Sequence, residues 1–236
     1  MAGGYMGKIL WVDLSTGNIK EEEVAEEIYK RFLCGYGLGA KVIYDRQKPG
    51  VDPLGPENTL GFMSGLLTAT GAQFVGRYMA VGKSPLTGGW GDANSGGYFS
   101  PEIKRAGFDG IFFTGRAEKP VYLFINGDKR ELRDAGHLWG RDVVESERLL
   151  REELRDEKIQ VACIGEGGER LSLISGIVTD KARIAARSGL GAVMGSKRLK
   201  ALAIKGNKSI PVYNQKELME LTRGFLKRIR VADRIK

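Results

Sequence analysis

Alternating apolar and polar residues near the start of the chain predict a β-hairpin. Residues 8–14 alternate up to a Ser-Thr-Gly-Asn turn, and residues 19–24 return as a second strand. Runs rich in β-branched and aromatic residues predict further strands at 59–68, 78–82, 110–114, 121–126, 159–164, 171–178 and 199–204. Asn126-Gly127 is a strong hairpin turn signal directly after one of these runs.

Helical patterns are fewer than strand patterns. They predict helices at residues 25–33, 40–45, 101–106 and 142–154, the first two separated by glycines at 35, 37 and 39. Asp142 followed by Glu145 resembles a capping box, which supports the start of the fourth helix. Because strands outnumber helices and do not alternate strictly with them, the fold class is predicted as α+β and not as a doubly wound parallel sheet.

The last segment of the chain predicts an amphipathic helix. Asn214 followed by Glu217 opens it, and Leu218, Phe225 and Ile229 share one face with Leu221. The sequence ends inside this charged helix without a Gly or Pro, so we expect residues 1–210 to form one domain and 211–236 to begin a truncated helical domain. The exposed apolar face predicts a covering partner or self-association, including a possible homodimer.

Glycines and basic residues gather in three segments. Residues 76–98 combine Arg77, Lys83 and Asn94 with many glycines, and residues 179–197 repeat the combination. Glycine lets backbone approach a ligand closely, and successive backbone N–H groups in such loops can hold an anion. The third segment, residues 32–41, contains the tetrapeptide GLGA at 37–40, which recurs at 189–192. We therefore expect two pseudo-repeats with these tetrapeptides at equivalent positions.

Composition narrows the class of protein. The 236 residues are 42% hydrophobic and 28% charged, which is ordinary for a globular protein, and no run is long enough to span a membrane. Together with the absence of a signal-peptide pattern, this predicts a cytoplasmic protein. The net charge of +8 permits an anionic partner. Aromatic residues do not interleave with the basic ones, so no nucleic-acid partner is expected.

No nucleophile and base can be paired in the sequence. The single histidine, His137, is expected in a loop, and Ser84 has no histidine to activate it. Asp92 and Asp109 could act as acids or bases, but turn and capping roles are favoured. No phosphate-binding loop of the nucleotide-binding kind follows a predicted strand. This chain is therefore expected to carry no catalytic residue.

Six blocks in order along the chain resemble the N-terminal domain of the aldehyde:ferredoxin oxidoreductase family of tungsten enzymes. They are GKILWVDLSTG at 7–17, VDPLGPEN at 51–58, GRYMAVGKSPLTG at 76–88, ANSGGYF at 93–99, AGFDGIFFTGRAEKPVYLFI at 106–125 and LGAVMGSKRLKA at 190–201. The resemblance implies a strand-rich α+β domain of two intertwined pseudo-repeats. It also implies a tungsten (or molybdenum) bis-pyranopterin cofactor that lies on this domain, with Mg²⁺ bridging the pterin phosphates.

Matching residue by residue, the resemblance implies two groups of cofactor contacts. The first is Arg77, Asn94, Ser95 and Gly96, and the second is Arg183, Ile184, Ala185 and Arg187. The backbone carbonyls of Asn94 and Ile184 would bind Mg²⁺, which prefers oxygen ligands. We expect Arg77 and Arg183 to face one concave surface from opposite halves of the fold. In one departure from the family, Ile184 and Ala186 replace small residues beside Arg183.

The resemblance also implies partners that this sequence does not supply. A [4Fe–4S] cluster needs about four thiolates, whereas Cys34 and Cys163 are far apart and lack a CxxC spacing. We therefore expect the cluster only in the remaining domains or subunits, and the isolated chain to be inactive. The implied activity is aldehyde oxidation with ferredoxin as electron acceptor. The alternatives are an aromatic acyl-CoA reductase of the same family and a non-catalytic pterin-binding module.

Overall fold

A computed structural model describes residues 3–232, so the first two and last four residues of the predicted domain ranges lie outside the described part. The first half of the domain contains β1 (Lys8–Asp13), β2 (Asn18–Glu23), α1 (Glu26–Phe32), α2 (Tyr36–Arg46), β3 (Leu60–Ser64), β4 (Tyr78–Lys83), β5 (Trp90–Ser95), α3 (Phe99–Arg105) and β6 (Gly110–Thr114). The second half contains β7 (Val121–Asn126), β8 (Lys129–Asp134), α4 (Val143–Leu154), β9 (Gln160–Cys163), α5 (Glu166–Glu169), β10 (Ile177–Thr179), β11 (Arg183–Ala185), α6 (Leu190–Ser196) and β12 (Leu199–Lys205). A final helix, α7 (Gln215–Val231), follows.

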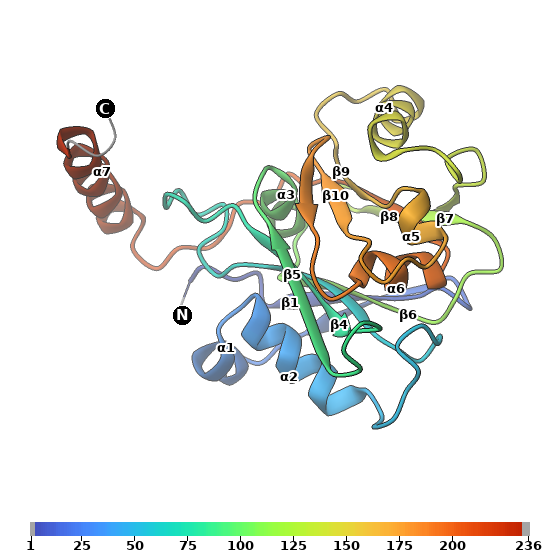
Figure 1. Cartoon of the computed structure of the whole chain (residues 1–236). Helices are drawn as coiled ribbons and strands as arrows, with labels where there is room; N and C mark the ends of the chain where they lie inside the picture. Colours follow the sequence, from blue (N-terminus) through green and yellow to red (C-terminus); the bar gives the residue numbers. More distant parts are fainter. Residues whose placement is uncertain (1–2, 233–236) are drawn as a thin grey trace.

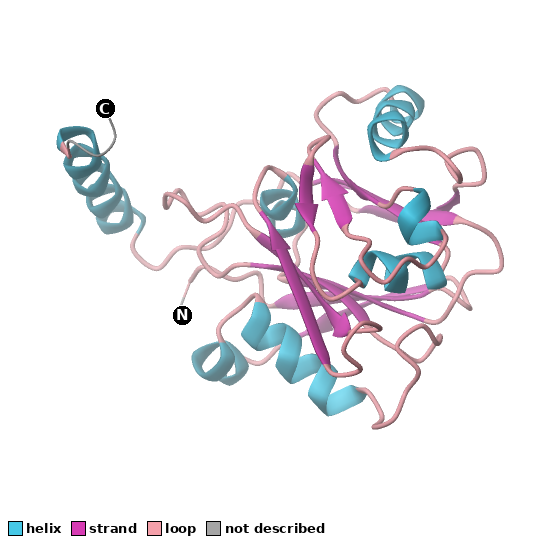
Figure 2. Cartoon of the chain, in the orientation of Figure 1, coloured by secondary structure: helices cyan, strands magenta, loops and turns pink. Residues whose placement is uncertain are grey.

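Within residues 3–232 the strands form two six-stranded sheets with the same topology; Figure 2 shows the strands in magenta. The first sheet has the order β2-β1-β6-β3-β4-β5, and the second, read from its other edge, has the order β8-β7-β12-β9-β10-β11. In each sheet the first strand of the half pairs in parallel with the last, and the other pairs are antiparallel. This repetition confirms the predicted α+β fold of two pseudo-repeats.

Three apolar clusters hold the layers together. The largest lies between the sheets, where α3 contacts β9 and β12 of the other half, and α6 contacts β3, β4 and β5 of the other half. Each half thus places its last helix against the sheet of its neighbour, which is how the repeats interlock. The second cluster lies under α1 and α2, and the third under α4, on the outer faces of the sheets (Figure 1).

The GLGA tetrapeptides do not mark the repeat. Residues 37–40 lie inside α2, between β2 and β3, whereas residues 189–192 begin α6, between β11 and β12. The helix that corresponds to α6 in the first half is α3, so the expected equivalence of the two tetrapeptides is wrong. Their likeness reflects separate needs for small residues at close packing sites.

Glycines at 37 and 39 do not interrupt the second helix, contrary to the prediction. A Cβ on Gly37 would lie 1.9 Å from the Phe32 carbonyl oxygen, so glycine allows α2 to begin directly against the end of α1. The predicted strand at 171–178 is also mostly wrong, because only Ile177–Thr179 pairs in a ladder. Leu171 has a φ of +58°, which turns the chain away from extended structure.

The helix α7 lies apart from the two sheets (Figure 1). The Asn214 side chain accepts a hydrogen bond from the Glu217 amide at 3.1 Å, as the capping pattern predicts. The helix α7 contacts the rest of the chain in part through Phe225, whose ring packs edge-on against the ring of Phe74 with 5.9 Å between centroids. Leu221 is 66% exposed. In the described part of the chain, no helix is long and apolar enough to cross a membrane.

Candidate functional site: a seam between two edge strands

The predicted site residues come from the edges of the two sheets. β5 is the edge strand of the first sheet and β11 is the edge strand of the second, so they hold the same place in the two repeats. The two strands contact each other. We call this contact the β5–β11 seam; it comprises Asn94, Ser95 and Gly96 on one side and Arg183–Ala185 on the other. An edge strand carries backbone groups without a ladder partner on one side, which leaves them able to bind a ligand.

Arg77 lies just before β4 and is held against the end of β5. Its Nε donates to the Asn94 Oδ1 at 2.6 Å, and its Nη2 lies 3.4 Å from the Asn94 carbonyl oxygen. The side-chain nitrogen of Asn94, Nδ2, in turn donates a hydrogen bond to the hydroxyl of Tyr36, the first residue of α2. Tyr36 was not among the predicted site residues, although it lies within the third glycine-rich segment.

Burial raises the pKa of the Tyr36 hydroxyl. Asp92 adds to the shift, whereas the Asn94 hydrogen bond and the positive charges of Arg77 and Arg187 oppose it. Both arginines therefore lie within electrostatic reach of this hydroxyl. The Tyr36 hydroxyl stays neutral at physiological pH and can accept the Asn94 hydrogen bond.

Gly96 lies between the two predicted arginines. A Cβ built on Gly96 would lie 3.7 Å from an Nη1 atom of Arg183 and 3.8 Å from the Nη1 atom of Arg77. The structure thus brings the two guanidinium groups together from opposite halves of the fold. That they face one concave surface stays a prediction. Because Gly96 has no side chain, the surface between the guanidinium groups is open to an approaching anion.

The remaining predicted contacts offer backbone more than side chain. Ser95 is buried and its hydroxyl lies 3.4 Å from the Gly96 carbonyl oxygen, and Ala185 is buried in the central core. Ile184 is 48% exposed. Arg187 is exposed and adds a third positive charge near the seam. Two guanidinium groups beside a glycine, with edge-strand carbonyls next to them, fit a phosphate-bearing group with a bridging hard cation.

The cysteines lie on opposite outer faces of the domain. Cys34 belongs to the cluster under α1 and α2, and Cys163 belongs to the cluster under α4. Burial raises the pKa of each thiol to about 12. Two protonated thiols separated by both sheets cannot ligate one cluster together. Among the described residues, no group of three or more His, Cys, Asp or Glu side chains is placed to hold a metal ion.

The candidate acids and bases have structural contacts. His137 lies in a turn, 3.1 Å from a Glu153 carboxylate oxygen. Ser84 accepts hydrogen bonds from the amides of two following residues and so closes the β4–β5 turn. Asp109 is fully buried, where its carboxylate accepts hydrogen bonds from the Met6 and Gly7 backbone amides and pairs with Lys104 at 2.9 Å. Asp92 lies within β5 and accepts from the Trp90 indole at 2.9 Å.

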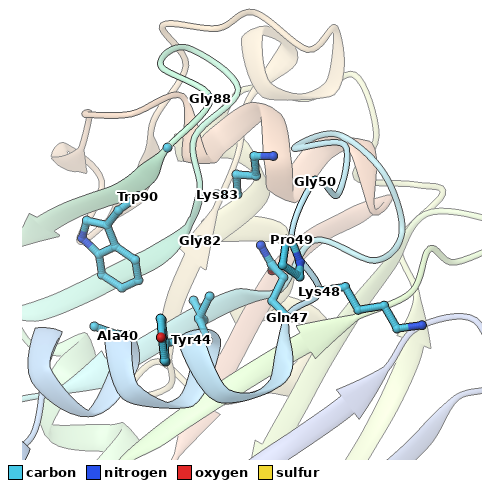
Figure 3. A pocket seen from close by; sticks show the side chains of 12 residues that line it. Ala40, Tyr44, Gln47, Lys48, Pro49, Gly50, Gly82, Lys83, Gly88 and Trp90 are labelled. Atoms are coloured by element: carbon cyan, nitrogen blue, oxygen red, sulfur yellow. The ribbon is translucent and has the colours of Figure 1, made fainter.

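A cavity of about 520 Å³ lies at the far end of the β4–β5 hairpin from the seam. Trp90 and Tyr44 border it from β5 and α2 (Figure 3). Lys83 pairs with Trp90 at this end of the hairpin, whereas Tyr78 pairs with Ser95 at the other. The cavity is therefore separate from the arginine-flanked seam.

Comparison with known proteins identifies the family. A family model described as "Aldehyde ferredoxin oxidoreductase, N-terminal domain" matches residues 9–206. A tungsten-containing aldehyde ferredoxin oxidoreductase from Pyrococcus furiosus is 46% identical over 227 residues, which cover 96% of this chain and 38% of that protein. The aliphatic sulfonate oxidoreductase, WOR-like subunit, of the same organism is 37% identical over 242 residues, covering 95% of this chain and 38% of that protein.

A solved structure has the same fold. It is the active site complex BamBC of benzoyl coenzyme A reductase in complex with 1,5 dienoyl-CoA, with a TM-score of 0.95 and 38% identity. The match covers 98% of this chain and 35% of that chain. These relatives are oxidoreductases. The chain belongs to the aldehyde ferredoxin oxidoreductase family, as the N-terminal domain, and it spans about 38% of the length of the curated relatives described above.

Proposed function

We propose that the β5–β11 seam binds the phosphate-bearing pterins of a tungsten (or molybdenum) bis-pyranopterin cofactor. The observation that carries the proposal is the pair of guanidinium groups, Arg77 and Arg183, on either side of Gly96. Each would give charge-assisted hydrogen bonds to phosphate oxygens, which are stronger than bonds between neutral groups. Ser95 and Gly96 would add backbone N–H groups, and Arg187 would add positive charge.

The two repeats would each serve one pterin. Asn94 and Ile184 lie on corresponding edge strands, and their carbonyl oxygens are the proposed Mg²⁺ ligands. When bound, the tungsten group supplies the two-electron redox chemistry. The chain's own residues bind and orient the phosphates and pterins.

For the complete protein, we propose oxidation of aldehydes to carboxylic acids with ferredoxin as electron acceptor. The support is the identity of 46% with a tungsten-containing aldehyde ferredoxin oxidoreductase. The second candidate is reduction of an aromatic acyl-CoA, which the TM-score of 0.95 to the BamBC complex favours. Aldehyde-dependent and acyl-CoA-dependent turnover, measured side by side on the complete protein, distinguish the two.

The proposed division of the chain follows the fold. Residues 1–210 would form the cofactor-binding domain, and residues 211–236 would begin the next, helical domain. The partners would be the remaining domains or subunits, which carry the [4Fe–4S] cluster, and ferredoxin in the cytoplasm. The 236-residue chain alone should fold without iron, carry little tungsten and show no aldehyde-dependent dye reduction, because one side of the seam would be open to water.

The direct test is the cofactor content of the complete protein with Arg77→Ala. Loss of a charge-assisted bond to phosphate should weaken binding by about 1.5–3 kcal/mol, or roughly tenfold to a hundredfold. When the supply of cofactor is limiting, the tungsten and pterin content per polypeptide should therefore decrease. Arg148→Ala is the matched control, since Arg148 forms an exposed pair with Glu152 on α4. Equal tungsten in the two variants would contradict the proposal.

A further inference from the structure

The side chain of Asp180 reaches from the second sheet to the first. Asp180 follows β10 directly, in the turn that leads to β11, and has a φ of +49°. Its Oδ2 accepts a hydrogen bond at 3.0 Å from the backbone amide of Tyr98, three residues beyond the end of β5. A single side chain therefore connects the ends of β5 and β10 beside the seam.

Gly97 makes room for this carboxylate. A Cβ on Gly97 would lie 1.8 Å from the Asp180 Oδ2 and 2.9 Å from the Arg183 Cδ. The φ of Gly97 is +119°, a conformation that L-residues avoid. The backbone next to Gly96 is thus shaped around Asp180 and the Arg183 side chain together.

The same carboxylate faces the Arg183 guanidinium. Arg183 Nε lies 4.0 Å from the Asp180 Oδ2, and the two side chains are 58% and 14% exposed. Arg77 in the other half is held by the neutral oxygens of Asn94. The two arginines therefore have different neighbours, an amide for Arg77 and a carboxylate for Arg183.

The turn that carries Asp180 has support of its own. The Lys181 amide donates to a Glu147 carboxylate oxygen at 2.9 Å, and the Ala182 amide donates to the Asp180 carbonyl at 2.7 Å. Neither bond uses the Asp180 side chain. Removal of that side chain should therefore leave the β10–β11 hairpin folded.

We infer that Asp180 is a positioning residue. Its carboxylate contacts both the Tyr98 amide and the Arg183 side chain, a pair of contacts that we call the clasp, and so sets the distance between the two halves of the anion site. The inference rests on the proposed function, because the contacts of Asp180 would position the groups that bind the phosphates. It predicts that loss of the carboxylate frees both the Tyr98 amide and the Arg183 guanidinium, and thereby weakens anion binding.

The test compares Asp180→Ala and Asp180→Asn in the ¹⁵N-labelled chain by NMR. Hydrogen exchange of the Tyr98 amide and the Nε–Hε signal of Arg183 report on the clasp without any ligand. Asp180→Ala should speed Tyr98 exchange about tenfold, the value expected for one lost hydrogen bond to a charged group. Asn tolerates the left-handed backbone and keeps an acceptor oxygen. Asp180→Asn should therefore restore Tyr98 protection while the Arg183 signal stays shifted.

Inorganic pyrophosphate, titrated by calorimetry, is the anion probe. Asp180→Ala should weaken its binding about tenfold, and Asp180→Asn, which restores only the Tyr98 contact, should regain part of the affinity. Asp128→Ala is the control, because Asp128 forms an exposed pair with Lys208. Unchanged Tyr98 exchange and Arg183 signal in a folded Asp180→Ala chain would overturn the inference. If both signals change but even the wild-type chain fails to bind pyrophosphate, the clasp stands and the proposed function loses support.

Discussion

Lys104 lies in the last turn of α3 and Lys197 directly follows α6, so each is near the end of the helix that precedes the last strand of its half, and an arginine follows each. Both are fully buried. Each ammonium group donates to two backbone carbonyl oxygens, Lys104 to those of Gly4 and Leu66 and Lys197 to those of Pro56 and Gly115. Lys104 in addition pairs with the Asp109 carboxylate at 2.9 Å. Both halves therefore bury an ammonium group bound to backbone carbonyls, and the first half adds a carboxylate to its partners.

The same difference separates the two sides of the seam. Arg77 is held by Asn94 and Arg183 lies beside Asp180, although β5 and β11 correspond in the topology. Backbone symmetry can serve two similar pterins, while unequal side chains let the two positions differ in charge. The comparison predicts that matched substitutions in the two halves have unequal effects.

The largest expected difference is between Lys104→Met and Lys197→Met. The first leaves the Asp109 charge buried without its ammonium partner and should lower the free energy of unfolding by about 3–5 kcal/mol. The second leaves only two carbonyls without that donor and should cost about 1 kcal/mol. Urea unfolding of both variants at pH 7 measures the difference. Equal losses in the free energy of unfolding would contradict the predicted difference between the two lysines.

A second pair of variants tests the seam itself. Gly97→Ala places a methyl group against Asp180 at a φ of +119° and should destabilise the domain by about 1–3 kcal/mol. Gly96→Ala meets only the ends of two flexible arginines and should stay within about 0.5 kcal/mol of wild type. Gly96→Ala should nevertheless lower the tungsten content of the complete protein. A stable Gly96→Ala variant with full tungsten content would argue against close approach at this glycine.

The smallest effect is a pH dependence of stability that comes from Lys197. Burial lowers the pKa of Lys197 to about 7, and the positive charge of Arg116 adds to the shift. Between pH 7 and pH 9 the unfolded chain keeps this proton while the folded chain releases it, so stability rises with pH. Relative to Lys197→Met, wild type should gain roughly 2 kcal/mol over this range. Parallel stability curves for the two proteins would show that Lys197 does not titrate there.

Local patterns predicted the parts of the fold whose stability is local. The β1–β2 and β7–β8 hairpins follow alternation and turn residues, and Asp142 caps α4 through the Glu145 amide at 2.8 Å as its spacing indicates. The strand β5 was not predicted, because its sequence, WGDANS, lacks the usual apolar alternation. It forms because it pairs with β4 along its whole length.

The site was predictable only in part for the same reason. Arg77, Gly96 and Arg183 stand out as basic and glycine residues matching family blocks, and the structure brings them together. Tyr36 and Asp180 were missed because each contributes through a contact between segments distant in the sequence, to Asn94 and to the Tyr98 amide. No spacing rule reveals such a contact. The GLGA match was misleading, because both tetrapeptides supply small residues at sites of close packing but do not occupy equivalent positions in the two halves.

The central claim is that the cofactor lies on the β5–β11 seam. Crystals of the complete, cofactor-loaded protein, measured at the tungsten absorption edge, would locate the metal directly. The account predicts an anomalous peak over the seam, with the cofactor phosphates between the guanidinium groups of Arg77 and Arg183. A peak elsewhere, such as over the cavity beside Trp90 and Tyr44, with those guanidinium groups in contact with solvent only, would contradict it.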